Sequence, residues 1–194
     1  MLTKVQSQIY TLDKYRALEE TADFRNEYHD GIIVPMSGGT INHNRIVCDL
    51  IFLLKIALKG TPYEIFSGDL RVWIPQYRRG TYPDVMLVSG KPVFNDNRKD
   101  EILNPSLIVE VLSKSTEEYD RGTNFLYYRS IPELKEYLLV SQYEYFVEHY
   151  QKTGEGQWLL QEYRENDQEI ALKSVDLSLA IKDIYQMVDF SLEE

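Results

Sequence analysis

The amino-acid sequence predicts a single α/β (α+β) domain, in which helical and strand-like segments are interspersed along the chain. Residues 40–59 form the longest segment with helical apolar periodicity, and Gly60 with Pro62 ends it. Residues 106–112 (SLIVEVL) are an almost unbroken aliphatic run, which is typical of a strand buried on both faces. The length of 194 residues is sufficient for one substantial core, and no internal repeat or clear linker divides the chain.

Local signals place the shorter elements of the N-terminal half. Thr11 precedes residues 12–21 (LDKYRALEET), whose apolar residues recur at helical spacing, so a short amphipathic helix is expected there. Residues 24–36 (FRNEYHDGIIVPM) predict a β-hairpin with the dipeptide Asp30-Gly31 as its turn. The next expected elements are strands over residues 63–74 and 82–88 and a polar surface loop over residues 91–104.

The C-terminal half combines a helix with several strands. Ser115 and Glu118 have the spacing of a capping box, which predicts a helix that runs to about Ser130. Strands are then expected within residues 131–142 and over residues 143–151, 156–163 and 168–174, followed by a closing helix over residues 177–188. We interpret residues 1–194 as one domain, with a core over about residues 10–145 and appended C-terminal strands and helix over residues 146–194.

Charge restricts the classes of partner. The net charge of -10 argues against a general nucleic-acid coat, but residues 144–194 contribute -8 of it and residues 1–143 only -2. Arg71, Arg78 and Arg79 could therefore form a local basic edge that tolerates a nucleic acid. The alternative is that these three arginines are ordinary surface charges.

Cysteine content and hydropathy indicate the compartment. The single cysteine, Cys48, excludes a disulfide framework and favours a reducing environment, and its apolar helical surroundings predict a small core residue. The N-terminal residues lack the apolar region of a secretion signal, and no stretch approaches the roughly 18 apolar residues of a membrane span. We therefore expect a cytoplasmic protein without a membrane partner.

Two acidic residues stand in strands where an unpaired charge is costly. Glu110 interrupts the aliphatic run 106–112, and Asp84 leads directly into another aliphatic run. Burying an unpaired carboxylate is expensive, so such a group is protonated, paired with a cation or bound to a metal. If the two strands are neighbours, a divalent ion would relieve the repulsion between the acids, and Mg²⁺ prefers such oxygen ligands. The alternative is a buried ion pair with Arg71 or Arg121.

Five sequence motifs resemble, in order and spacing, the Uma2 (DUF820) family of predicted endonucleases. The motifs are EYHDGIIVPMSGGTINHNRI, SGDLRVWIP, YPDVMLVSG, NPSLIVEVLSKSTEEYDRG and YYRSIPELKEYLLVSQ. The similarity covers about residues 10–145, and the combination of a PDV strand, an IVEVLS strand and a DRG helix is specific. The resemblance implies a restriction-endonuclease-like fold of the PD-(D/E)XK type, with a mixed β-sheet core flanked by helices.

The resemblance also implies roles for individual residues. Asp84 and Glu110 would be the metal-binding acids, and the backbone carbonyl of Val111 would add a third metal ligand. Glu27 matches the family's N-terminal acid and would bind metal or water in the catalytic site. The alternative for Glu27 is a solvated glutamate of the hairpin.

The lysine that usually assists such a site is absent from its expected positions. Leu112 stands two residues after Glu110, and Asn124 occupies the helical position to which the family's lysine has moved. Asparagine donates hydrogen bonds but carries no charge. Lys114 is a substitute, because in an extended strand it would lie on the same side as Glu110, whereas Arg121 would act only by charge. The alternative for Lys114 is a solvated loop lysine.

Three functional hypotheses follow from these residues. The first is a Mg²⁺- or Mn²⁺-dependent endonuclease that hydrolyses nucleic acid, DNA in the first place, by a metal-activated water. The second is a catalytically impaired pseudo-nuclease that binds nucleic acid or a protein, which Asn124 and the acidic total favour. The third is a structural domain whose acids pair with arginines. A homodimer is left open, because nucleases that cut both strands often pair.

Overall fold

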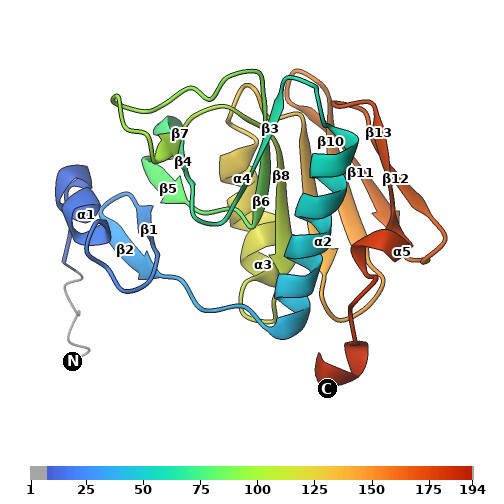
Figure 1. The fold of residues 1–194 in the computed structure, drawn as a ribbon. Helices are drawn as coiled ribbons and strands as arrows, with labels where there is room; N and C mark the ends of the chain where they lie inside the picture. The colour runs from blue at the N-terminus through green and yellow to red at the C-terminus, as the bar shows by residue number, and fades with distance from the viewer. Residues whose placement is uncertain (1–7, 194) are drawn as a thin grey trace.

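The computed structural model describes residues 8–193, and its centre is a six-stranded mixed sheet with the order β11-β10-β9-β8-β6-β3 (Figure 1). Strand β8 lies antiparallel to β6 and parallel to β9, so the two strands that carry the candidate acids are neighbours. The strands of this central sheet are β3 (Tyr63–Ser67), β6 (Val85–Ser89), β8 (Pro105–Leu112), β9 (Glu136–Ser141), β10 (Val147–Gly154) and β11 (Gln157–Tyr163).

A second, five-stranded sheet has the order β2-β1-β5-β4-β7, and a third sheet is the hairpin of β12 and β13. Four strands of the second sheet pair antiparallel, and β7 joins β4 in parallel. The bounds of these strands are β1 (Asn26–His29), β2 (Ile32–Pro35), β4 (Arg71–Ile74), β5 (Arg79–Thr81), β7 (Glu101–Ile102), β12 (Glu169–Leu172) and β13 (Leu177–Ala180).

Helix α2 lies on one face of the central sheet and α4 on the other, as the mixed α/β prediction requires (Figure 1). One continuous helical stretch, residues 117–128, consists of α3, a π-helical turn η2 and α4. The helical segments are α1 (Leu12–Glu19), α2 (Ile41–Ala57), η1 (Pro75–Tyr77), α3 (Glu117–Tyr119), η2 (Asp120–Asn124), α4 (Phe125–Tyr128), α5 (Ile181–Ile184) and η3 (Phe190–Glu193). No helix among the described residues has the length and apolar character needed to cross a membrane.

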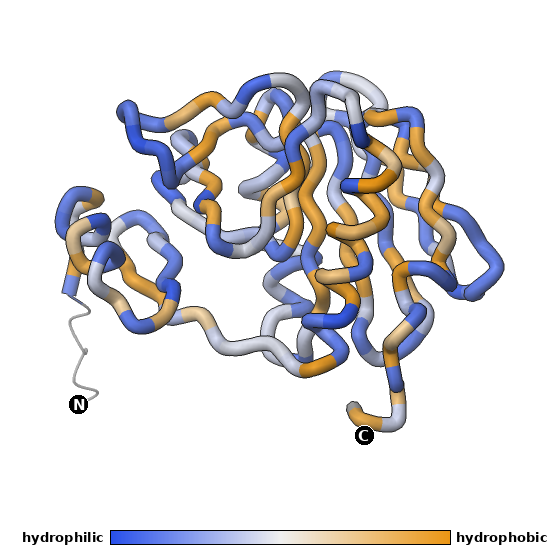
Figure 2. The backbone as a smooth tube through the Cα atoms, viewed as in Figure 1, coloured by the Kyte–Doolittle hydropathy of each residue, from blue (hydrophilic) through white to orange (hydrophobic). Residues whose placement is uncertain are grey.

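Strand alternation in β8 sends successive side chains into two different cores. Val109 and Val111 pack against α2 on one face, whereas Ile108 and Leu112 belong to the core that contains α4 on the other. Hydrophobic residues accordingly concentrate along the central strands (Figure 2). Glu110 has the parity of Ile108 and Leu112, so the strand presents its carboxylate to the helical stretch 117–128.

Several predicted elements are confirmed and others differ; the polar surface loop expected over residues 91–104, for example, contains the buried strand β7. The hairpin turns at Asp30-Gly31 with positive φ at both residues, and α2 begins after Thr40, whose hydroxyl accepts from the His43 amide. The expected strand 63–74 is two strands in separate sheets, because the chain turns between Ser67 and Arg71.

The helix expected over residues 177–188 is wrong for its first part. Leu177–Ala180 is strand β13, because this segment pairs antiparallel with β12, and only Ile181–Ile184 is helical. Cys48 is exposed on α2, so its prediction as a core residue is also wrong. The helical periodicity of residues 40–59 correctly predicted α2, but it did not indicate that Cys48 lies on the solvent-exposed side of that helix.

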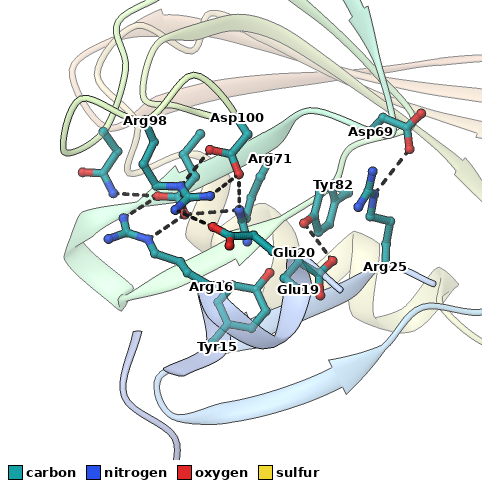
Figure 3. Close-up of polar contacts among 12 residues, drawn as sticks. Tyr15, Arg16, Glu19, Glu20, Arg25, Asp69, Arg71, Tyr82, Arg98 and Asp100 are labelled. Carbon is teal, nitrogen blue, oxygen red and sulfur yellow. Dashed lines mark hydrogen bonds and ion pairs between the residues drawn. The ribbon is translucent and has the colours of Figure 1, made fainter. Parts of the chain in front are cut away.

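A buried ionic cluster attaches α1 to the second sheet (Figure 3). Arg71 is only 1% exposed and lies 2.9 Å from Asp100 and 3.3 Å from Glu101, while its guanidinium also faces the Tyr15 ring. Arg16 of α1 donates to Glu101 at 2.6 Å and 2.9 Å. Arg71 therefore does not form part of the basic surface edge that the sequence predicted, because its side chain is buried.

Removing the acid at the centre of this cluster should destabilise the protein strongly. Glu101 is fully buried, so Glu101→Leu would leave Arg16 and Arg71 without their shared counter-charge at a cost of about 3–5 kcal/mol. Urea unfolding measures this loss. As a control, Asp30→Asn breaks only the exposed pair with Arg78 and should cost far less; equal costs for the two variants would contradict the assignment.

Candidate metal centre

Asp84 and Glu110 lie together at the point where β6 and β8 separate. The register of the two strands ends with Val85 opposite Val109, so the next amides have no partner in the adjacent strand. The side chains replace that partner: Asp84 Oδ2 accepts from the Val111 amide at 2.7 Å, and Glu110 Oε2 accepts from the Asp84 amide at 3.2 Å. Each acid is thus fixed by backbone beside the other, which is the adjacency that the sequence could not establish.

The second oxygen of Glu110 is held by neutral donors. The Tyr128 hydroxyl donates to Glu110 Oε1 at 2.9 Å, and the Asn124 amide nitrogen lies 3.4 Å from the same oxygen. Tyr128 is itself within 2.8 Å of the Thr81 hydroxyl. Glu110 is 9% exposed, so these uncharged contacts orient a carboxylate that has little access to water.

The helical stretch 117–128 presents three polar side chains to β8 at intervals of four residues. Asp120, Asn124 and Tyr128 therefore lie on one face of the helix. Asn124 donates to Asp120 at 3.1 Å, and its own Oδ1 is buried without a hydrogen-bond partner among the described residues. Such an unsatisfied acceptor requires a donor or a cation from outside the chain.

Asp120 lines the same cavity as Asp84 and Glu110, a position that was not predicted from the sequence. Burial raises the pKa of Asp120 to about 6, and the charge of Asp84 acts in the same direction. The sequence could have indicated this position, because Asp120 lies four residues before Asn124, a predicted site residue, and residues at that spacing share one face of a helix.

The pKa of Glu110 is raised by its buried surroundings and by neighbouring acids. Burial, followed by the charges of Asp84 and Asp120, raises the pKa of Glu110 well above its usual range. The charges of Asp84 and Asp120 therefore oppose the ionisation of Glu110, and a cation beside Glu110 would favour its charged form.

Arginine does not supply that cation, so the alternative of a buried ion pair is wrong. Arg71 pairs with Asp100 and Glu101, as described above, and Arg121 is 2.6 Å from Glu148 and 2.8 Å from Glu117. Among the residues that the structure describes, neither arginine reaches Asp84 or Glu110.

His43 is the one side chain that forms an ion-pair contact with Asp84 within residues 8–193. Its Nε2 lies 3.1 Å from Asp84 Oδ2. Burial opposes protonation, but the hydrogen bond and the charge of Asp84 leave the pKa of His43 raised. Gly39 makes this position possible, because a Cβ there would lie 2.7 Å from His43 Nδ1.

The acids face a common cavity of about 630 Å³ between the two larger sheets. Glu27, on β1, reaches the cavity and is 2.6 Å from His29. Lys114 also lines it, although β8 ends at Leu112 and strand alternation therefore does not place this lysine. The residues relevant to chemistry on its wall are Glu27, His43, Asp84, Glu110, Val111, Lys114, Asp120, Asn124, Gln142 and Tyr143.

The donor set suits a hard cation with few protein ligands. Within residues 8–193, no three Asp, Glu, His or Cys side chains form a ready-made metal cage. Mg²⁺ does not need one, because it commonly takes one or two carboxylates and keeps several waters. Asp84 Oδ1 accepts no hydrogen bond from the described residues, and the free Asn124 Oδ1 could accept from a metal-bound water.

The fold is that of the restriction-endonuclease-like nucleases. A crystal structure from Anabaena variabilis, described as "a putative nuclease belonging to DUF820", matches this chain with a TM-score of 0.76. The match covers 93% of this chain and 99% of that one at 19% sequence identity, so it shows the architecture and not the activity.

The chain belongs to the Uma2 family. The family model, described as "Putative restriction endonuclease", matches residues 12–182. An uncharacterised protein of Synechocystis sp. is 43% identical over 170 residues, covering 88% of this chain and 96% of its own length. A second uncharacterised protein of that organism is 37% identical over 179 residues, covering 92% of each chain. The resemblance and the fold class predicted from the sequence are thereby confirmed.

Without metal, removal of the Glu110 charge should not destabilise the protein. In Glu110→Gln the new amide can donate to the Tyr128 oxygen, because the Tyr128 proton can turn to Thr81. We expect a melting temperature in EDTA equal to or above that of the unmodified chain.

The matched control for this prediction is another buried glutamate with a different environment. Glu136 accepts from His149, from the Lys173 amide and from Ser174, and these contacts outweigh burial and lower its pKa. Glu136→Gln should therefore lower the melting temperature. A similar loss in Glu110→Gln would show that the Glu110 carboxylate is balanced by the chain itself.

Proposed function

We propose that this protein is a divalent-metal-dependent endonuclease that hydrolyses phosphodiester bonds of nucleic acid, with DNA as the expected substrate. The observation that carries the proposal is the pair Asp84 and Glu110, fixed by each other's backbone in an acidic cluster that no arginine or lysine of residues 8–193 neutralises. Membership in a family described as restriction endonucleases supports the same reaction class.

Asp84 and Glu110 would hold Mg²⁺ or Mn²⁺, with the Val111 carbonyl as a further ligand and Glu27 binding metal or water from the opposite sheet. When bound there, such an ion supplies a water of lowered pKa and positive charge for the oxygens of the reacting phosphate. The two sheets therefore contribute different acids to one centre.

Several other side chains fix the acids in place. Tyr128 and Asn124 orient Glu110, and His43 together with the Val111 amide orients Asp84 Oδ2, leaving Asp84 Oδ1 directed to a ligand. Burial of Glu110 limits the access of water to that carboxylate.

Lys114 is the cation available to the reacting phosphate. It lines the cavity, and its ammonium lies 5.3 Å from the centre of the Tyr143 ring, whose hydroxyl accepts from the Lys114 amide. This contact positions an exposed lysine at the edge of the site. Asn124 instead supplies only hydrogen bonds inside the cavity.

A pseudo-nuclease is the second candidate, and Asn124 is the observation that favours it. The side chain stands between Glu110 and Asp120, where an ammonium would neutralise both acids. Without that charge the chain would retain a nucleic-acid or protein binding site with little hydrolysis.

Asp84→Asn should remove both metal binding and cleavage. The amide offers no anionic ligand, so the rise in melting temperature with Mg²⁺ or Mn²⁺ should disappear, and cleavage of plasmid DNA should fall by about 100-fold or more. The control Asp176→Asn makes the same chemical change at an exposed turn residue and should retain both properties. Full cleavage by Asp84→Asn would refute the proposed centre.

Asn124→Lys should increase cleavage. A lysine here would place its ammonium beside Glu110 and Asp120, and general acid–base or charge assistance of this type contributes about 100-fold or more. Single-turnover cleavage rates of the variant and the unmodified chain measure the effect. Asn124→Met controls for side-chain length without charge; if no form of the protein cleaves, the pseudo-nuclease is favoured instead.

A further inference from the structure

Arg79 lies one aromatic ring away from the candidate metal centre. It is on β5, and the register of β1 with β5 places it directly opposite His29. Directly opposed residues in a sheet present their side chains on the same face. Tyr119 of α3 covers both of them, stacking on His29 at 6.1 Å and accepting from Arg79 Nη1 at 2.6 Å. His29 and Tyr119 line the cavity, so Arg79 stands immediately behind its wall.

The Arg79 guanidinium is held in a fixed orientation by aromatic rings. Its central carbon lies 4.0 Å from the centre of the Tyr127 ring, and Tyr127 packs against Tyr77 at 4.5 Å. The planar group is thus oriented before any ligand arrives, which lowers the entropy that binding would cost.

Arg79 carries a charge that no acid of the described residues neutralises. The other two arginines of the predicted basic edge differ from it: Arg71 is buried in the ionic cluster, and Arg78 pairs with Asp30 at 2.7 Å. Arg79 has no ion pair within residues 8–193, and its remaining N–H groups are not among the buried unsatisfied atoms. These donors are therefore open to solvent.

The position of this charge complements the acids in the cavity. The four carboxylates that line the cavity would repel the backbone of a nucleic acid unless cations flank its path. Lys114 supplies such a charge at the mouth of the cavity, and Arg79 supplies another beyond Tyr119. A guanidinium also matches the geometry of phosphate oxygens with two parallel hydrogen bonds.

We infer that Arg79 binds a backbone phosphate of the nucleic-acid strand, next to the phosphate that enters the cavity. The inference rests on the proposed function for the identity of the ligand. Arg79 is a substrate-positioning residue in this arrangement, and Tyr119 and Tyr127 keep its guanidinium in place.

Binding measurements test this inference without requiring cleavage. The probes are a fluorescein-labelled single strand and a duplex of the same sequence, measured by fluorescence anisotropy with Mg²⁺ in an Asp84→Asn background that cannot hydrolyse them. Arg79→Gln should raise the Kd by about 10-fold on at least one probe and lower the slope of log Kd against log salt by about one. The probe with the larger loss identifies the strand form that Arg79 contacts.

Arg78→Gln is the matched control, because it removes a neighbouring arginine that is already paired with Asp30. It should change the Kd by less than about twofold. Arg79→Lys keeps the charge but not the planar group, so it should retain the salt slope while losing part of the affinity. Melting temperatures confirm that each variant folds.

The outcomes separate this inference from the proposed function. Equal effects of Arg79→Gln and Arg78→Gln, or no binding of either probe, would overturn the role of Arg79. If binding depends on Arg79 but no metal supports cleavage by the unmodified chain, the endonuclease proposal fails and the phosphate contact stands. If the unmodified chain cleaves and Arg79→Gln binds normally, only the phosphate contact fails.

Discussion

The reciprocal hydrogen bonds of Asp84 and Glu110 determine the arrangement of the candidate site. Where β6 and β8 separate, two backbone amides lose their strand partners, and unpaired buried amides are costly. The two carboxylates satisfy those amides, so the acids complete the hydrogen bonding of the sheet as well as facing the cavity. The hydrogen bonds that close this part of the fold therefore also hold the two acids side by side.

The environment of Glu110 contrasts with that of Glu101, a buried glutamate of the second sheet. Glu101 lies within 4 Å of Arg16, Arg71 and Arg98. Glu110 has Tyr128, Asn124 and a backbone amide around it, with two further acids close enough to raise its pKa. The chain thus neutralises one buried acid with arginines and leaves the other without a counter-charge. This difference is what separates a structural ion cluster from a centre that can receive a cation.

The sequence predicted the central elements because their signals are local. An aliphatic run identified β8, and the interruption of that run identified Glu110. Asp120 and His43 escaped assignment because their roles depend on tertiary neighbours: both sit on helices where a polar residue is unremarkable until the packing against β6 and β8 is known. Packing also decides that Arg71 is buried in an ion cluster whereas Arg79 lies against Tyr119, and the charge pattern of the sequence does not specify this difference.

The bounds of several helices and strands were predicted wrongly for a similar reason. Ser115 and Glu118 have the spacing of a capping box, yet the helix begins at Glu117, whose amide bonds to the Ser113 carbonyl. Residues 177–180 carry apolar residues that fit either periodicity, and pairing with β12 selects the strand. Long-range pairing outweighed local preference in both the C-terminal hairpin and the division of residues 63–74.

The lack of a side chain at Gly39, in the loop before α2, leaves room for the His43 imidazole that contacts Asp84. Any larger residue there would press on the imidazole of His43 and turn it from Asp84. The identity of a loop residue with no polar side chain is therefore tied to the orientation of an acid on a different strand. A substitution at Gly39 would therefore act on the acid pair indirectly, through the imidazole of His43.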